Sequence, residues 1–275
     1  MDTLHSLILL ALQEDSGLGD ITSESLFPTG LTGTGIIVAK EPLVLAGVNV
    51  AARVFTLLDP HCETVFLFDD GDTVSSGDTV FSVKGDIIAL LKGERVALNF
   101  MQRLSGIATL TRTYVTALGD SRVRLTDTRK TVPGWRVIEK AAVRAGGAYN
   151  HRFSLYDGVL IKDNHIAVSG NIASAVSRVR ARVSHLMKIE VETSTLAQVQ
   201  EALDAGAEVI MLDNMTIDLM KEAVALIKGR ALVEASGNIT LDTIRAVAAT
   251  GVDVISTGAL THQARAVDLS MRISV

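Results

Sequence analysis

Two patterns of apolar and polar positions divide the chain. Up to about residue 93, short alternating apolar runs are separated by turn residues, which predicts β-strands. These predicted strands cover residues 35–39, 43–48, 63–68, 79–84 and 87–91. The next segment, 94–118, has helical periodicity, and we expect one long helix that bridges two differently built parts.

Beyond this helix, strand-like and helix-like runs alternate. The predicted strands are 123–127, 158–161, 187–191, 209–212, 232–235 and 254–256. Predicted helices between the later strands are 196–205, 217–227 and 241–249, with Thr240 as an N-cap and Gly206, Gly229 and Gly251 as closing residues. A spacing of roughly 22 residues is typical of successive βα units.

Polar residues follow nearly every one of these later strands. Examples are residues 127–130, 162–165, 213–214 and 236–238. Reactive groups from all strand ends converge only when a parallel sheet closes, whereas an open sheet concentrates them at one switch point. The pattern therefore favours a barrel, smaller than the usual eight-stranded one.

Composition supports a globular core of aliphatic residues. Hydrophobic residues make up 48% of the chain, charged residues 21% and aromatic residues 4%. With the single cysteine Cys62, no intrachain disulfide can form, and an ordinary structural cysteine is the favoured interpretation. The segment 1–12 lacks the basic start of a signal peptide, and no run is long enough for a membrane helix, so a cytoplasmic protein without membrane contact is expected.

Charge points to a small anionic ligand. The net charge is −5, which makes nucleic acid an unsuitable partner. Seven Lys or Arg residues nevertheless lie between Arg129 and Lys162. Helical spacing explains some of them as a solvated helix face, but Arg129, Arg152 and Lys162 lie at element ends, where a cationic patch can bind an anion.

Two glycine turns near the C-terminus have the pattern of a phosphate site. Ser236-Gly237-Asn238 and Thr257-Gly258-Ala259 each follow an apolar strand and precede a helix-like run. Glycine lets backbone N–H groups approach an anion, and loops after the last barrel strands often hold phosphate. Their joint position favours this interpretation over two plain turns.

Charged side chains at other strand ends complete the candidate site. Glu192 and Asp213 follow adjacent strands, where carboxylates can hold ribose hydroxyls, bind magnesium or stabilise a cationic sugar. Glu190 has the same facing as Glu192, so the pattern does not choose between them. A set of basic groups suits a ligand with several carboxylates or phosphates: Arg129, Lys130, His151, Arg152 and Lys162.

Five ordered motifs carry a resemblance to a known family. They are residues 93–99 with 104–109, residues 127–134 (hereafter the signature loop), residues 150–152 with 155–157 and 160–166, residues 210–214, and residues 258–262. Together they resemble quinolinate phosphoribosyltransferase over nearly the whole chain. Departures at Val132, Trp135, Phe153 and Ser154 remove none of the charges named above.

The resemblance implies an α/β protein of two domains. An N-terminal open α/β sandwich would span residues 1–105, and an incomplete α/β barrel of six to seven strands would span residues 106–264. The tail, 265–275, would pack back onto the first domain. A homodimer, or a higher oligomer, with shared active sites is also implied.

The resemblance further implies the role of each site residue. Quinolinate would be bound by Arg129, His151, Arg152 and Lys162, with Arg95 contributed by the neighbouring subunit. Lys130, Glu192 and Asp213 would be the catalytic residues and would engage phosphoribosyl pyrophosphate (PRPP) and Mg²⁺. The metal would be held mainly through PRPP, with Glu192 and Asp213 as candidate ligands. Ser236, Gly237, Gly258 and His262 would lie around the phosphate.

The implied reaction transfers a phosphoribosyl group from PRPP to quinolinate, giving nicotinate mononucleotide, pyrophosphate and CO₂ for NAD biosynthesis. Three rivals are a paralogue associated with molybdate uptake, a nicotinate or nicotinamide phosphoribosyltransferase, and a non-catalytic barrel that binds a phosphorylated metabolite. The intact segment 162–165 argues against the paralogue, and the acids Glu192 and Asp213 argue against a pure anion binder.

Overall fold

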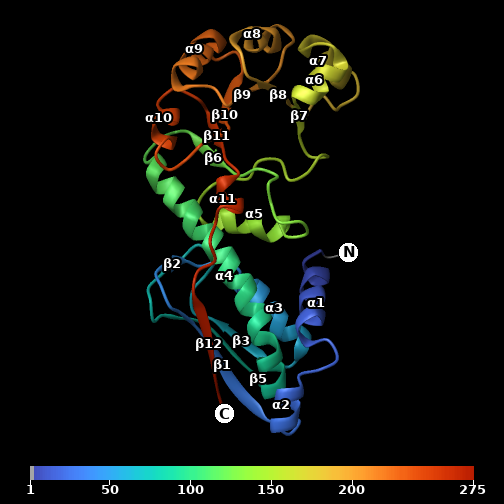
Figure 1. Ribbon diagram of the computed structural model, residues 1–275, viewed down its shortest axis with the longest axis vertical. Helices are drawn as coiled ribbons and strands as arrows, with labels where there is room; N and C mark the ends of the chain where they lie inside the picture. The colour runs from blue at the N-terminus through green and yellow to red at the C-terminus, as the bar shows by residue number, and fades with distance from the viewer. Residues whose placement is uncertain (1–2) are drawn as a thin grey trace. The chain divides into compact units, whose positions relative to one another are not determined.

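A computed structural model describes residues 3–275, and the chain forms two compact units (Figure 1). The first, which we call the sheet unit, comprises the residues up to Arg112 together with Thr131–Gly147 and Leu260–Val275. The second, the barrel unit, comprises Thr113–Lys130 and Ala148–Ala259. No helix in the described part of the chain is long and apolar enough to cross a membrane.

The sheet unit is built on a four-stranded antiparallel sheet with the order β12-β1-β5-β3. Its strands are β1 (Thr32–Ala39), β3 (Glu63–Phe66), β5 (Thr79–Asp86) and β12 (Leu269–Ser274), and β2 (Leu43–Val44) pairs separately with β4 (Thr73–Val74). Strand β12 lies against β1, so the end of the chain pairs with one of its first strands.

Helices complete the sheet unit. They are α1 (Thr3–Ser16), α2 (Ile21–Leu26), α3 (Val48–Leu58), the first part of α4 (Ile87–Leu118) and α5 (Arg136–Ala145). Phe55 of α3 and Phe81 of β5 are fully buried and stack with ring centroids 6.0 Å apart. Aromatic and aliphatic packing between helix and sheet thus forms this core.

One predicted strand in this unit is wrong. Residues 87–91 begin α4 and are not a strand, so the helix starts seven residues before the predicted Glu94. A short apolar run fits a buried strand and a buried helix turn equally well, and here the long helical pattern that follows extends backwards through it. Only Leu43–Val44 of the predicted strand 43–48 is extended, because α3 begins at Val48.

The barrel unit contains six parallel strands in the order β6-β11-β10-β9-β8-β7. They are β6 (Arg124–Thr126), β7 (Val159–Ile161), β8 (Ile189–Thr193), β9 (Val209–Asp213), β10 (Leu232–Ser236) and β11 (Val254–Ser256). Strands β6 and β7 end the sheet and do not pair with each other, so the barrel is incomplete. This arrangement confirms the predicted fold class.

Helices connect the barrel strands, and α7, α8 and α9 lie along the outside of β7, β8 and β9 in Figure 1. The connecting helices are α6 (Asp163–Ser169), α7 (Ile172–Arg180), α8 (Leu196–Asp204), α9 (Ile217–Ile227) and α10 (Ile244–Ala248), and α11 (Ala259–His262) follows the last barrel strand. The predicted cap Thr240 is wrong: α10 has Thr243 at its N-cap, and Thr240 belongs to the turn before it. Strand β8 also begins two residues later than predicted.

The register of the parallel strands sets which side chains share a level. Glu192 pairs with Met211, and Met211 pairs with Glu234. One level higher, Asp213 pairs with Ser236, and Ser236 pairs with Ser256. Side chains of paired residues in a parallel sheet point to the same face, so the acids of three strands lie on one side of the sheet.

Candidate active site

The carboxyl ends of the barrel strands bring most of the predicted site residues into one unit. Arg129 and Lys130 follow β6, Lys162 follows β7, and His151 and Arg152 lie in the loop before β7. Glu192, Asp213 and Ser236 belong to the ends of β8, β9 and β10, and Gly258 follows β11. Function in α/β barrels is concentrated at this end of the strands.

Lys162 and Glu192 form an ion pair across the ends of β7 and β8. The Lys162 ammonium donates a hydrogen bond to Oε2 of Glu192. The Lys162 side chain is 44% exposed and the Glu192 side chain 14%. The cation is therefore accessible to a ligand, while the carboxylate is held beneath it.

The β9 and β10 ends are joined by an amide network. Asn214 donates from Nδ2 to Oδ2 of Asp213 at 2.7 Å and accepts a bond from Nδ2 of Asn238 at 2.9 Å. Gly237, with φ of +88°, lies so close that a Cβ there would be 2.3 Å from Oδ1 of Asn214. Glycine is therefore required at this turn, both for its backbone conformation and for space.

The turn after β11 is held from two sides. The Thr257 backbone N–H donates to the carbonyl of Thr126 at 3.1 Å, and its hydroxyl accepts a bond from the Ala259 N–H at 3.2 Å. Gly258 between them is buried. The backbone at this predicted phosphate turn is thus fixed by its neighbours.

His151 is placed between two buried acids. Its Nε2 lies 3.3 Å from Oε2 of Glu190 and 3.4 Å from Oε1 of Glu234. Burial alone lowers the pKa of His151, but the hydrogen bonds and charges of the two carboxylates outweigh it and raise the pKa to about 10. Burial, and then the charge of Glu234, raise the pKa of Glu190 against the lowering effect of His151.

The same three residues bring one ligand atom each to within 4.8 Å of one another, a spacing that a metal ion requires. The hydrogen bonds oppose such a site. The Arg152 backbone N–H donates to Nδ1 of His151 at 2.8 Å, so the single proton of the neutral ring occupies Nε2, the atom that would bind the metal. This contact opposes the imidazolium form, but the two carboxylates outweigh it, and Nε2 carries a proton in both forms.

Asp127 fixes the loop that carries His151. The Asp127 carboxylate is fully buried and accepts bonds from Nδ2 of Asn150 and from the backbone N–H of His151, both at 2.8 Å. Because Asp127 opens the signature loop, one carboxylate sets the position of both basic segments.

Arg152 and Arg129 form the cationic part of the site. Burial, followed by the charge of Arg129, lowers the pKa of the Arg152 guanidinium. Arg152 also donates from Nη1 to the Gly158 carbonyl at 2.9 Å. Two neighbouring guanidinium groups repel each other, and a bound anion would relieve that repulsion.

Two predicted site residues, Arg95 and His262, belong to the sheet unit. Arg95 is an exposed residue of α4, and His262 is the exposed last residue of α11. The other predicted site residues belong to the barrel unit.

Sequence reasoning missed Glu234 and left Glu190 undecided. Each lies inside a mainly apolar strand, Glu190 in Ile189–Thr193 together with Glu192, and Glu234 as the one acid of Leu232–Ser236. Because side chains alternate along a strand, both acids face the same side as the residues at the strand ends. A search for polar residues two positions before each strand end could have found them. Their common partner, His151, is more than 35 residues away and gives no local signal.

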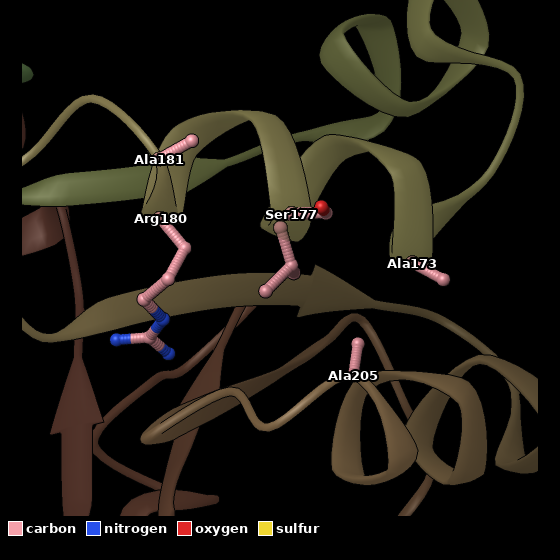
Figure 2. Close-up of a pocket in the computed structure, with 6 residues that line it drawn as sticks. Ala173, Ser177, Arg180, Ala181 and Ala205 are labelled. Carbon is pink, nitrogen blue, oxygen red and sulfur yellow. The ribbon is translucent and has the colours of Figure 1, made fainter.

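Two hollows lie in the barrel unit. One, of about 780 Å³, is lined mainly by apolar residues around β7, including Tyr156 and Val168, with Arg152 at its edge. The other, of about 490 Å³, lies between α7 and α8 and is shown in Figure 2. Three of its six lining residues are alanines, and its Arg180 is already paired with Glu208 at 2.6 Å, so it lacks the groups needed for chemistry.

Known proteins resemble the chain along almost its full length. A probable nicotinate-nucleotide pyrophosphorylase (carboxylating) of Bacillus subtilis is 46% identical over 262 residues, which cover 95% of this chain and 90% of that protein. A quinolinate phosphoribosyltransferase (decarboxylating) of Nicotiana tabacum is 41% identical, covering 98% and 82%.

Solved structures agree. NadC from Streptococcus pyogenes superposes with a TM-score of 0.94 at 44% identity, covering 98% of this chain and 96% of that one. The nicotinate-nucleotide pyrophosphorylase from Francisella tularensis gives 0.94 at 38% identity, covering 99% and 96%. Residues 20–105 match the N-terminal domain of quinolinate phosphoribosyl transferase, and residues 107–272 match its C-terminal domain. The chain therefore belongs to the quinolinate phosphoribosyltransferase family.

Proposed function

We propose that this protein transfers the phosphoribosyl group of PRPP to quinolinate with loss of CO₂, giving nicotinate mononucleotide and pyrophosphate. One observation carries the proposal. A cluster of cations and a pair of carboxylates lie at the same end of the barrel strands, and the ion pair between Lys162 and Glu192 connects them. The names of the relatives support the same activity. Neither the site nor these relatives favour the paralogue, nicotinate-specific or metabolite-sensing rivals.

Quinolinate carries two carboxylates on a pyridine ring, and the cationic cluster suits it. Arg129 and Arg152 can pair carboxylates bidentately, and Lys162 supplies an accessible point charge. His151, which contacts Glu190 and Glu234, belongs to the same loop as Arg152. In a dimer, Arg95 of the neighbouring subunit would add a further guanidinium to this pocket.

PRPP would occupy the other half of the site. Lys130 would neutralise its pyrophosphate, and the turns at Ser236-Gly237 and Gly258, with His262, would surround the 5-phosphate. Glu192 and Asp213 end adjacent strands on the same face of the sheet, and their oxygens are the donors that Mg²⁺ prefers when it also binds phosphate. Mg²⁺ held there through PRPP would neutralise the leaving pyrophosphate.

The reaction then needs positioned charge more than covalent help. As pyrophosphate leaves C1 of the ribose, positive charge develops on the sugar, and Glu192 and Asp213 would stabilise it. The pyridine nitrogen forms the new bond to C1 and becomes cationic. Its positive charge stabilises the electron pair left on the adjacent ring carbon when the carboxylate there leaves as CO₂, and that carbon then takes up a proton.

Dimer formation is part of the proposal. The barrel is open between β6 and β7, and exposed apolar side chains lie beside this opening: Leu155 at 70% exposure, Tyr156 at 77% and Val168 at 89%. A single-chain surface seldom leaves so many large apolar residues exposed together. A second copy of the chain would cover them and bring Arg95 to the pocket.

The test compares quinolinate with nicotinate as acceptor, in the presence of PRPP and Mg²⁺. Formation of nicotinate mononucleotide from quinolinate but not from nicotinate is the expected result, because nicotinate lacks the second carboxylate that the arginine pair would bind. Turnover of nicotinate without turnover of quinolinate would transfer the assignment to the nicotinate-specific rival, and equal turnover of both would contradict the proposed selectivity.

A further inference from the structure

Arg103 of α4 connects two other segments of the sheet unit. Its Nε and Nη2 donate to Oε1 of Glu139 at 3.2 and 3.0 Å. Its Nη1 donates to the Ala264 carbonyl at 2.8 Å, and Nη2 donates to the Thr261 carbonyl at 2.7 Å. The Glu139 side chain is completely buried and the Arg103 side chain is 24% exposed, so each charge depends on the other.

The second oxygen of Glu139 reaches the signature loop. Oε2 accepts a hydrogen bond from the Val132 backbone N–H at 3.2 Å, and Val132 lies two residues after Lys130. Trp135 stacks on Phe100 of α4 with ring centroids 4.6 Å apart, which fixes the end of the same segment. The conformation of the loop is therefore set by α4 through a buried carboxylate and an aromatic pair.

The other end of the Arg103 guanidinium holds the segment that follows the second phosphate turn. Thr261 and Ala264 lie on either side of His262, and Gly258 comes immediately before α11. Carbonyl groups at the end of a helix have no partner within it, and a guanidinium can satisfy two of them at once. Arg103 therefore holds the segment around α11 directly and the signature loop through Glu139.

We propose that Arg103 and Glu139 are positioning residues that fix the signature loop and the α11 segment relative to each other. The proposal rests on the proposed function, because Lys130 and Arg129 precede Thr131 in the loop and His262 lies within the α11 segment. Displacing such groups by about 1 Å costs an enzyme up to roughly 100-fold in rate. Neither Arg103 nor Glu139 needs to touch a substrate to have this effect.

Arg112 provides a matched control on the same helix. It donates to the carbonyls of Gly146 at 3.0 Å, Gly71 at 3.2 Å and Ala145 at 3.3 Å. These contacts hold the far end of α5 and do not involve the signature loop or α11. Arg112 therefore has a comparable structural role without the proposed positioning role.

The experiment compares Arg103→Lys with Arg112→Lys in the full-length protein. Lysine keeps the charge but cannot reproduce the planar fork that binds Glu139 and both carbonyls. For Arg103→Lys we expect the KM values for quinolinate and PRPP to rise together and kcat/KM to fall by about 10-fold or more, whereas Arg112→Lys should stay within about 2-fold of the unsubstituted protein. Glu139→Gln, which keeps the shape of the side chain, should behave like Arg103→Lys.

Hydrogen exchange of the peptides 129–135 and 259–265 gives a readout independent of activity. Faster exchange in both peptides is expected for Arg103→Lys and not for Arg112→Lys. Equal kinetics and equal exchange in the two variants, at similar unfolding temperatures, would overturn the proposal. If the unsubstituted protein does not convert quinolinate, the proposed function fails, but the exchange comparison still decides whether Arg103 couples the two segments.

Discussion

The ammonium of Lys162 donates a hydrogen bond to Oε2 of Glu192, so one ion pair links the proposed quinolinate and PRPP halves of the site. In the proposed site, a carboxylate of quinolinate would compete with Glu192 for this cation. Binding of quinolinate would therefore change the charge that Lys162 and Glu192 offer to PRPP, so substitution of either residue should alter substrate binding.

Glu192→Gln and Lys162→Met should change quinolinate binding in opposite directions. Removing the competing carboxylate should tighten quinolinate binding in the absence of PRPP by roughly two- to fivefold, the value of an accessible ion pair. Removing the cation should weaken it. Isothermal titration of quinolinate checks both, and weaker binding to Glu192→Gln would contradict the competition.

Asp213→Asn should spare binding and slow turnover. The amide keeps the shape of the side chain but cannot stabilise a developing positive charge, so kcat should fall by about 100-fold or more. The KM for quinolinate should change little, and the KM for PRPP should change much less than kcat, because the metal would be held mainly through PRPP. Steady-state kinetics with each substrate varied separately measures this, with Asp218→Asn on the exposed surface of α9 as a control. Unchanged kcat would remove Asp213 from the catalytic set.

Stability should decline at alkaline pH because of His151. Its pKa is raised to about 10 in the folded protein from an ordinary value of 6.5, so its stabilising contribution is full below pH 6.5 and is lost as pH rises through 10. Glu234→Gln removes one of the two carboxylates that raise this pKa. The unfolding temperature should therefore fall less between pH 7 and pH 10 in Glu234→Gln than in the unsubstituted protein, and a parallel decline would show that His151 does not carry this effect.

Mixing two inactive variants tests the shared site. If Arg95 acts in the neighbouring subunit, dimers that combine Arg95→Ala and Lys162→Ala subunits contain one intact site and one doubly defective site. Equal mixing and random exchange should restore roughly a quarter of full activity. Each variant alone is the control, and no recovery after verified subunit exchange would mean that Arg95 does not act in trans.

Periodicity predicted most of the fold because each barrel strand is an apolar run followed by a polar end. The runs 209–212 and 232–235 match β9 and β10 within one residue. The start of α4 at Ile87 could not be read from its five apolar residues, because such a run lacks a period that separates strand from helix. The N-cap of α10 at Thr243 depends on the turn that starts at Thr240, which a cap pattern alone does not show.

The candidate site was predictable where chemistry follows a strand end and unpredictable where it depends on a distant partner. Lys162, Glu192 and Asp213 could be named from their place in the pattern. The contact of Glu234 with His151 and that of Glu139 with Val132 arise only from folding, since both acids occupy positions that look like ordinary members of a strand or helix. Residue type and spacing along the chain do not predict such pairings.

The central claim is tested most directly by measuring CO₂ and pyrophosphate released by the purified protein from quinolinate and PRPP in the presence of Mg²⁺. The account predicts equal amounts of the two products and no release when PRPP is left out. Pyrophosphate without CO₂, or neither product from a correctly folded protein, would contradict it.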